Sequence, residues 1–209
     1  MKEFSQKYHS LLFNEFGSLN LTRISDEQEF YDKQIVDSVF PFEKFEIFKT
    51  ELRKCGKHLD IGFGGGFPLL PLARLNTDFQ FIGFEARRKK AEAVFKIANS
   101  LELANVKTYH SRIEEVFIDE SVTVSFKAVG KIKEFLKKIN TNEEVTVFFY
   151  KGPNLMELEE VPNKVSNFNK ILNEKYTLPS GQIRHLVVYK SVRVPRRTKK
   201  DLVNLSELI

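Results

Sequence analysis

The feature of this sequence that most clearly indicates chemistry is an acidic residue followed by alternating glycines. Asp60 lies within the strand-like run 58–61, Gly62, Gly64 and Gly66 follow that run, and a helical pattern begins where the loop ends. Glycine has no side chain, so a loop rich in it lets the backbone approach a ligand closely. The loop therefore predicts a ligand site. If the glycines formed only a tight turn, their entropic cost would have no packing gain to offset it.

The spacing of the glycines separates two cofactor classes. A dinucleotide loop needs G-x-G-x-x-G, but the third glycine position holds Phe67 or Leu69, depending on which glycine starts the count. S-adenosylmethionine (SAM) carries an ammonium and a sulfonium in place of a pyrophosphate, so a carboxylate such as Asp60 is favourable for it. Glu85 ends the next apolar run, where a carboxylate can accept hydrogen bonds from both ribose hydroxyls. SAM is therefore favoured over NAD, and the residues expected to bind it are Asp60, Gly62, Gly64 and Glu85.

Strand-like and helical patterns alternate from residue 57 onward. The strand-like runs are 58–61, 79–84, 106–109, 122–126 and 145–150. The helical patterns cover 68–75, 86–101, 112–117 and 131–139. This alternation predicts a parallel sheet covered by helices on both faces, and the last two runs, 166–176 and 184–190, predict an antiparallel hairpin. The expected fold class is α/β, a Rossmann-like, mostly parallel sheet with one antiparallel strand.

Residues 1–54 contain helical patterns and no strand pattern. One helix is predicted to begin at a capping box of Ser25 and Gln28 and to end before Pro41. We therefore expect three parts: an N-terminal helical segment (1–54), a SAM-binding domain (55–192) and a basic C-terminal tail (193–209).

The net charge of +5 is concentrated near the C-terminus. Residues 175–200 hold eight Lys or Arg and no Asp or Glu, a pattern typical of phosphate contact, although a solvated tail would have the same composition. The cluster 87–90 is either a second basic contact or a solvated helix face. The residues expected to bind RNA phosphates are Arg184, Arg193, Arg196, Arg197, Lys199 and Lys200.

Composition also points to a compartment. The single cysteine, Cys55, cannot form an internal disulfide, and neither a membrane-spanning apolar run nor a signal peptide is visible. A cytoplasmic protein is expected. Neither a serine–histidine nucleophile motif nor a cluster of metal ligands is seen, so no catalytic side chain is assigned.

The stretch 110–115 allows two interpretations. Ile113 and Glu114 are suited to holding an adenine, with the apolar side chain on its face and the carboxylate at its edge. Equally, Ser111 and Glu114 match the capping box of a helix.

Taken together, these residues resemble the RsmG (GidB) family, which methylates N7 of a guanosine in bacterial small-subunit (16S) ribosomal RNA. The matching pieces are Asn20-Leu21-Thr22, Asp37-Ser38, the glycine loop continued by Phe67-Pro68-x-x-Pro71-Leu72, Ser111-Arg112-x-Glu114-Glu115, Lys127-Ala128, Lys151-Gly152 and Arg184-His185. The resemblance implies a SAM-dependent methyltransferase acting on 16S rRNA or a small-subunit precursor. It implies that SAM contacts Gly62, Phe67, Ile113 with Glu114, and Lys127, with Glu85 as the ribose acid. A monomer is expected.

Two departures from the family bear on function. Lys127 stands where the family usually has arginine, so the planar fork is lost, and Gln34 stands where a histidine is usual. The alternatives are a SAM-dependent methyltransferase for another RNA, a protein or a small molecule, and a non-catalytic ribosome-binding relative. Guanine N7 has a free lone pair and no proton to remove, so the expected reaction needs alignment and charge stabilisation without a general base.

Overall fold

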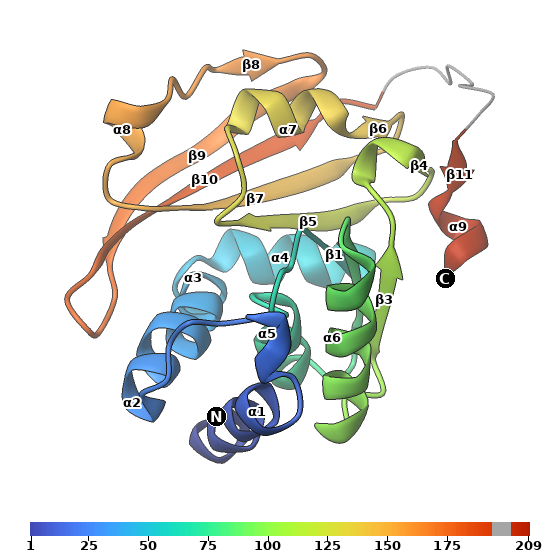
Figure 1. Cartoon of the computed structure of the whole chain (residues 1–209). Coiled ribbons are helices and arrows are strands. Elements are labelled where there is room, and N and C mark those ends of the chain that lie inside the picture. The colour runs from blue at the N-terminus through green and yellow to red at the C-terminus, as the bar shows by residue number, and fades with distance from the viewer. Residues whose placement is uncertain (194–201) are drawn as a thin grey trace.

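The computed structural model describes residues 1–193 and 202–209. In this part of the chain, one sheet has the strand order β3-β2-β1-β5-β7-β10-β9-β8 (Figure 1). Its strands are β1 (Lys57–Ile61), β2 (Gln80–Glu85), β3 (Val106–His110), β5 (Val122–Lys127), β7 (Val145–Lys151), β8 (Lys164–Val165), β9 (Phe168–Thr177) and β10 (Ile183–Ser191). The first five in chain order pair in parallel, whereas β10 is antiparallel to β7 and β9. The predicted α/β fold with a mostly parallel sheet and an antiparallel hairpin is confirmed.

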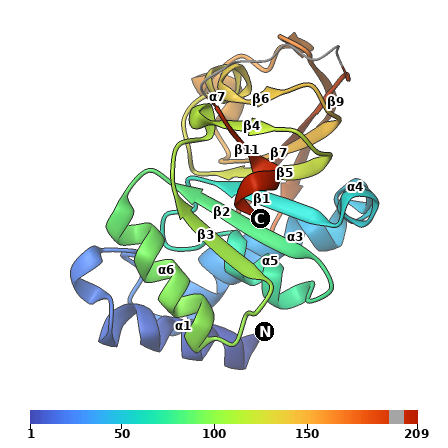
Figure 2. The same ribbon diagram turned by 90° about the vertical axis from the view of Figure 1, so that its right-hand side faces the viewer.

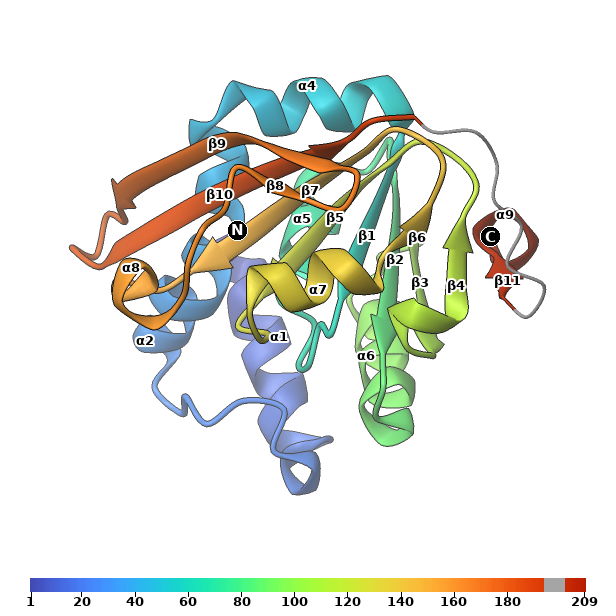
Figure 3. The same cartoon turned by 90° about the horizontal axis from the view of Figure 1, so that it is seen from above.

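Helices cover both faces of the sheet. The helices on one face are α1 (Lys2–Asn14), α3 (Asp37–Lys44), α4 (Glu46–Cys55), α5 (Leu69–Leu75) and α6 (Arg88–Ser100). The helices on the other face are α7 (Ile132–Lys138), the short α8 (Leu155–Leu158) and α9 (Leu205–Leu208), and Figure 3 shows α4 and α7 on opposite sides. Among the described residues, no helix has the length and apolar character needed to cross a membrane.

The core places N-terminal side chains against the sheet. Phe4, Tyr8 and Phe48 belong to the same buried cluster as Phe148 and Leu186, which lie on β7 and β10. Because burial of a shared apolar surface stabilises all the contributing segments together, the first helices pack as part of this core. The boundaries at 54/55 and 192/193 stay predictions.

The N-terminal region differs from its prediction in one helix. Asp26 is the N-cap of α2 (Glu27–Phe30), and its Oδ1 accepts a hydrogen bond from the amide of Glu29 at 2.7 Å. A π-helical segment, η2 (Tyr31–Val36), then leads into α3, which contains Pro41. The prediction that Pro41 ends the helix was wrong, because burial of Pro41 and Phe42 in the core outweighs the local preference against proline.

A small second sheet was not predicted. It has the order β11-β4-β6, with β4 (Val116–Ile118) between β11 (Val203–Asn204) and β6 (Asn140–Thr141), as Figure 2 shows. The prediction of a helix over 112–117 was wrong, since only the 3-10 turn η3 (Ile113–Glu115) is helical. The three residues of β4 are all buried, and consecutive burial favours an extended strand over an amphipathic helix.

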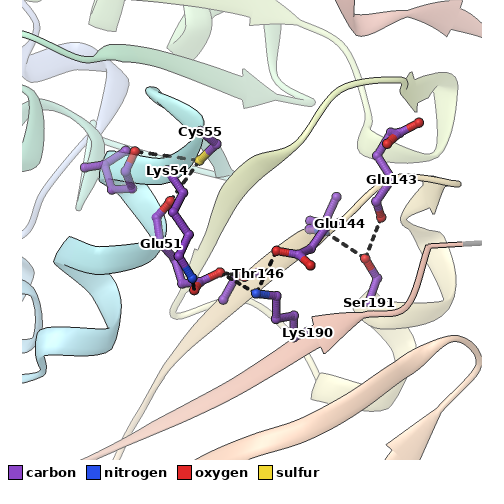
Figure 4. A network of polar contacts seen from close by, with 10 residues as sticks. Glu51, Lys54, Cys55, Glu143, Glu144, Thr146, Lys190 and Ser191 are labelled. Atoms are coloured by element: carbon purple, nitrogen blue, oxygen red, sulfur yellow. Dashed lines mark hydrogen bonds and ion pairs between the residues drawn. The ribbon is translucent and has the colours of Figure 1, made fainter.

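A polar network ties α4 to the sheet at the edge opposite the glycine loop (Figure 4). Oε2 of Glu51 lies 2.8 Å from Nζ of Lys190 and 2.8 Å from the hydroxyl of Thr146, and Lys54 lies 2.6 Å from Oε1. Burial alone would raise the pKa of Glu51, but hydrogen bonds from Lys190, Lys54 and Thr146 outweigh it and lower the pKa to about 2. The network therefore holds an ionised carboxylate between α4, β7 and β10.

Candidate functional site

The glycine loop joins β1 to α5 at the carboxyl end of the parallel strands. Gly64 and Gly66 have φ angles of +57° and +95°, values that residues with a side chain rarely adopt. A Cβ at Gly65 would lie 2.5 Å from the carbonyl oxygen of Leu21, and a Cβ at Gly66 would collide with the hydroxyl of Tyr8. In contrast, a Cβ at Gly64 would meet no atom closer than 4.0 Å. The loop is thus packed against the N-terminal segment on one side and open at Gly64.

Glu85 lies beside the open part of the loop. Its Oε2 accepts a hydrogen bond from the amide of Gly64 at 3.1 Å, and its Oε1 accepts one from the amide of Arg87 at 2.9 Å. Each carboxylate oxygen has a further lone pair, so Glu85 can also accept from hydroxyl groups. The amide of Gly62 donates to the carbonyl of Phe84 at 2.8 Å and keeps the ends of β1 and β2 together. The predicted residues Gly62, Gly64 and Glu85 are therefore neighbours.

Asp60 lies beneath the loop with none of its surface exposed. Its Oδ2 accepts from the amide of Leu69 at 2.9 Å, and its Oδ1 lies 2.9 Å from the hydroxyl of Ser125. Burial raises the pKa of Asp60 to about 7, although these hydrogen bonds and the charge of Lys127 oppose the rise. Asp60 thus supports the start of α5 and can act on a ligand through its electric field.

A chain of polar side chains continues from Asp60 into the sheet. Nε2 of His58 lies 2.9 Å from the hydroxyl of Ser125, and Nδ1 of His58 lies 2.9 Å from the hydroxyl of Thr123. Thr123 in turn donates to the carbonyl of Lys57 at 3.1 Å. Burial lowers the pKa of His58 to about 3, so the imidazole is neutral near pH 7. A neutral, hydrogen-bonded relay therefore lies directly below the glycine loop.

An ion-pair cluster lies at the carboxyl end of β5. The carboxylate of Asp37 bridges two cations, with Oδ2 3.3 Å from Nζ of Lys127 and Oδ1 3.0 Å from Nε of Arg184. The ring of Phe67 lies below Lys127, with 5.9 Å between Nζ and the ring centroid, and stacks on Tyr8 at 5.1 Å. The N-terminal helices thus reach the same edge of the sheet as the glycine loop.

The stretch after β3 combines parts of both interpretations. Ile113 is buried in the second core cluster, and Glu114 forms an ion pair with Lys138 at 3.5 Å. The capping carboxylate is Glu115 instead of Glu114, because Oε2 of Glu115 accepts from the amide of Arg112 at 3.0 Å. The assignment of Ile113 and Glu114 to an adenine site stays a prediction.

The predicted RNA-binding residues lie in different surroundings. The guanidinium of Arg184 contacts Asp37, the carbonyl of Ile183 and the side chain of Gln182. Arg193 is exposed, and its Nε lies 3.2 Å from Oε2 of Glu143. The other four, Arg196, Arg197, Lys199 and Lys200, lie outside the described residues.

Sequence reasoning did not assign a role to His58, Thr123, Ser125 or Asp37. A signal for the first three was present: His58 and Asp60 alternate on one strand, and Thr123 and Ser125 alternate on another. Residues two apart in a strand share a face, and β1 and β5 pair with Asp60 opposite Ser125. The approach of Asp37 to Lys127 had no local signal, because it depends on how α3 packs against the sheet.

The fold and the site define a class of protein. A parallel sheet whose first strand leads into an open glycine loop, and whose second strand ends in a carboxylate at that loop, is typical of SAM-dependent methyltransferases.

Comparisons with known proteins narrow this class. The family described as rRNA small subunit methyltransferase G matches residues 1–187. A "Ribosomal RNA small subunit methyltransferase G" of Pseudothermotoga lettingae is 35% identical over 89% of this chain and 84% of its own length. The protein of the same name from Clostridium novyi is 33% identical over 97% of this chain and 90% of its own length.

A solved SAM-dependent methyltransferase from Aquifex aeolicus is 16% identical, with a TM-score of 0.45 over 75% of this chain and 95% of that one. This likeness is too distant to identify a family, and family membership is established by the sequence matches. The chain belongs to the rRNA small subunit methyltransferase G family. It is accordingly a SAM-dependent rRNA methyltransferase, as the resemblance implied.

Proposed function

We propose that this protein transfers the methyl group of SAM to N7 of a guanosine in 16S ribosomal RNA, and that the cofactor lies over the glycine loop. The observation that carries the cofactor site is the contact between Glu85 and the amide of Gly64. This contact places the carboxylate beside Gly64, the one residue of the Gly64–Gly66 turn where an added Cβ would meet open space. This geometry fits a ribose beside an exposed backbone.

The residues present fit the cofactor. Glu85 would hold the ribose hydroxyls, and Gly62 and Gly64 would face the cofactor with their backbone. Asp60 would favour its positive charge from below, since a buried carboxylate interacts strongly with a nearby cation. Phe67 and Lys127 would lie at the methyl end, and Ile113 with Glu114 at the adenine. When bound, SAM supplies an electrophilic methyl group on a sulfonium.

The chemistry places few demands on side chains. Guanine N7 has a lone pair in the ring plane and carries no proton, so the protein has to orient the base in line with the methyl group. As the methyl group moves, positive charge shifts from the sulfur to the purine, and fixed dipoles and carboxylates stabilise it. This explains why a site made of glycines, buried carboxylates and one lysine is sufficient.

The RNA is proposed to be held by the basic residues near the C-terminus. Arg193 is exposed, which supports a phosphate contact, and Arg184 lies at the site edge with its charge partly balanced by Asp37. Arg196, Arg197, Lys199 and Lys200 would extend this surface. A cytoplasmic monomer acting on 16S rRNA or a small-subunit precursor completes the proposal.

The test is transfer of labelled methyl from SAM to 16S rRNA that lacks the modification, followed by mapping of the modified nucleotide. We expect label at N7 of one guanosine, and at least a tenfold loss of SAM affinity in Glu85→Gln, about the effect of losing a hydrogen bond to a charged group. Glu92→Gln is the matched control, because Glu92 lies on the exposed face of α6. The proposal would be contradicted if no labelled methyl appeared in the rRNA. It would also be contradicted if the enzyme consumed SAM at the same rate with and without RNA.

A further inference from the structure

Lys127 and Asp37 form a largely buried ion pair at the carboxyl edge of the sheet, on the same side as the glycine loop. Their side chains are 11% and 9% exposed, and Oδ2 of Asp37 is 3.3 Å from Nζ of Lys127. The side chain of Gln34 also approaches, with Oε1 3.5 Å from Nζ. The two residues come from α3 and β5, which are far apart in the sequence. The pair therefore depends on the docking of the N-terminal helices.

Stability does not account for such a pair. Burying a lysine and an aspartate removes both from water, and replacement by apolar residues is often neutral or stabilising. With SAM over the glycine loop as proposed, the location is less favourable still, because Lys127 lies beside Phe67 of that loop and its ammonium would repel the sulfonium. Asp37 reduces that repulsion, with its one negative charge shared between Lys127 and Arg184. The pair keeps a donor at this position without the full electrostatic penalty of a free cation.

The ammonium of Lys127 is a hydrogen-bond donor, and the guanine atom next to N7, O6, is an acceptor. In guanine, the O6 acceptor lies beside N7 on the same edge, whereas adenine carries an amino donor there. An ammonium has three N–H groups. Lys127 donates one to Gln34 and forms an ion pair with Asp37, which leaves at least one N–H for a ligand. A guanine whose N7 faces the methyl group therefore also turns O6 toward the protein at that end of the site.

We propose that Lys127, held by Asp37, donates a hydrogen bond to O6 of the target guanine and thereby selects guanine over adenine. This inference rests on the proposed methylation of guanine N7. Lys127 is the specificity-determining donor in it, and Asp37 is a positioning residue that acts through Lys127. Asp37 has a second effect: it lowers the charge near the purine as that ring becomes positive.

The test compares two RNA substrates with four forms of the enzyme. One 16S rRNA carries guanosine at the mapped position. The other, made by ligation, carries 2-aminopurine ribonucleoside, which keeps N7 and lacks O6. The wild type is compared with Lys127→Met, Lys127→Arg and Asp37→Asn, and kcat/KM is measured for each combination. The intrinsic reactivity of the analogue is the same for every enzyme form, so it cancels in the comparison of preferences.

Preference is the ratio of kcat/KM on the guanosine RNA to kcat/KM on the 2-aminopurine RNA. We expect this ratio to be roughly 10- to 100-fold larger for the wild type than for Lys127→Met, because that is the effect of losing one hydrogen bond to a charged group. Lys127→Arg should keep the preference, because arginine retains a charged donor. Asp37→Asn should lower kcat more than it raises KM for RNA, and should reduce the preference. A merely structural role of Asp37 would lower the rates on both substrates equally.

Lys151→Met is the matched control. Lys151 pairs with Glu159 at 2.6 Å, and the two side chains have the same exposures, 11% and 9%. This variant should keep the wild-type preference. If Lys127→Met lowers the rates on both RNAs by the same factor, or weakens only SAM affinity, the inference is overturned while methylation of guanosine by the wild type still supports the proposed function. If the wild type does not methylate the guanosine RNA, the proposed function itself has failed.

Discussion

His58 and Asp60 are connected through the hydroxyl of Ser125, which lies 2.9 Å from Nε2 of the histidine and 2.9 Å from Oδ1 of the aspartate. The hydroxyl has one proton and can donate to only one of them. If Asp60 is ionised, Ser125 donates to it and His58 carries its proton on Nε2. Nδ1 of His58 then accepts from the hydroxyl of Thr123, which turns away from the carbonyl of Lys57. If Asp60 is protonated, it can donate to Ser125, and Ser125 donates to an unprotonated Nε2. The charge of Asp60 and the tautomer of His58 are therefore coupled.

The opposite pKa shifts of Asp60 and His58 predict compensating effects of pH on stability. The folded-state pKa of Asp60 is about 7 against 3.8 in the unfolded chain, so its contribution is present below pH 3.8 and is lost as the pH rises to about 7. The folded-state pKa of His58 is about 3 against 6.5, so its contribution is present above pH 6.5 and is lost as the pH falls toward 3. Between about pH 4 and 6.5 the two slopes oppose each other.

Single replacements should reveal each slope. In Asp60→Asn, the free energy of unfolding should fall on acidification by up to about 1.4 kcal/mol per pH unit, and in His58→Asn it should fall as the pH rises, by a similar amount. Urea unfolding across this range measures both. The charges that face Asp60, Lys127 and Glu85, are unchanged in these variants. Identical pH slopes in the two variants would contradict the opposite pKa shifts of Asp60 and His58.

Two glycine replacements should separate cofactor binding from folding. Gly64→Ala adds a Cβ into open space, so it should weaken SAM binding at least tenfold while costing only about 1 kcal/mol of stability for the positive φ. Gly66→Ala forces a Cβ against Tyr8 and Leu70 and should lower stability by about 2 kcal/mol or more. Calorimetric titration with SAM and thermal unfolding distinguish them. Equal losses of stability would argue against an open ligand face at Gly64.

The network around Glu51 should matter for stability and leave the ligand site unaffected. Glu51→Gln is expected to lower the free energy of unfolding by about 2 kcal/mol at neutral pH, because Lys190 loses a buried partner. Since the pKa of Glu51 is about 2 against 4.5 when unfolded, this difference should shrink as the pH falls from 4.5 toward 2. Glu46→Gln on the exposed face of α4 is the control, expected to change stability by less than about 1 kcal/mol. SAM affinity should be unchanged in both.

The basic residues outside the described part of the chain should affect RNA binding alone. Replacing Arg196, Arg197, Lys199 and Lys200 by glutamine should reduce the slope of log K for RNA against log salt by up to about 3, if each residue contacts a phosphate of single-stranded RNA. SAM affinity should stay constant. Replacing four exposed lysines elsewhere, Lys131, Lys133, Lys137 and Lys164, by glutamine removes the same number of charges and controls for net charge. An unchanged salt slope would indicate that the basic residues form a solvated tail.

The sequence allowed the main sheet to be predicted because its strands are short apolar runs separated by helical patterns. The proximity of the glycine loop to Glu85 could also be predicted, since the carboxyl ends of parallel strands meet at one edge of the sheet. The pairing of β4 with β11 and β6 was not, because three-residue and two-residue strands have no periodicity to detect. The same holds for Asp37 and Lys127, whose contact depends on the packing of distant elements, and for Pro41, whose burial overrides local propensity.

The first helix has a consequence for anyone who shortens or extends this protein. The hydroxyl of Tyr8 donates to the carbonyl of Gly65, and its ring stacks on Phe67, so the eighth residue forms a wall behind the glycine loop. Removing the first eight residues would remove that wall, although the cut lies 57 residues upstream of Gly65. Reporter fusions at this end would crowd the same helix.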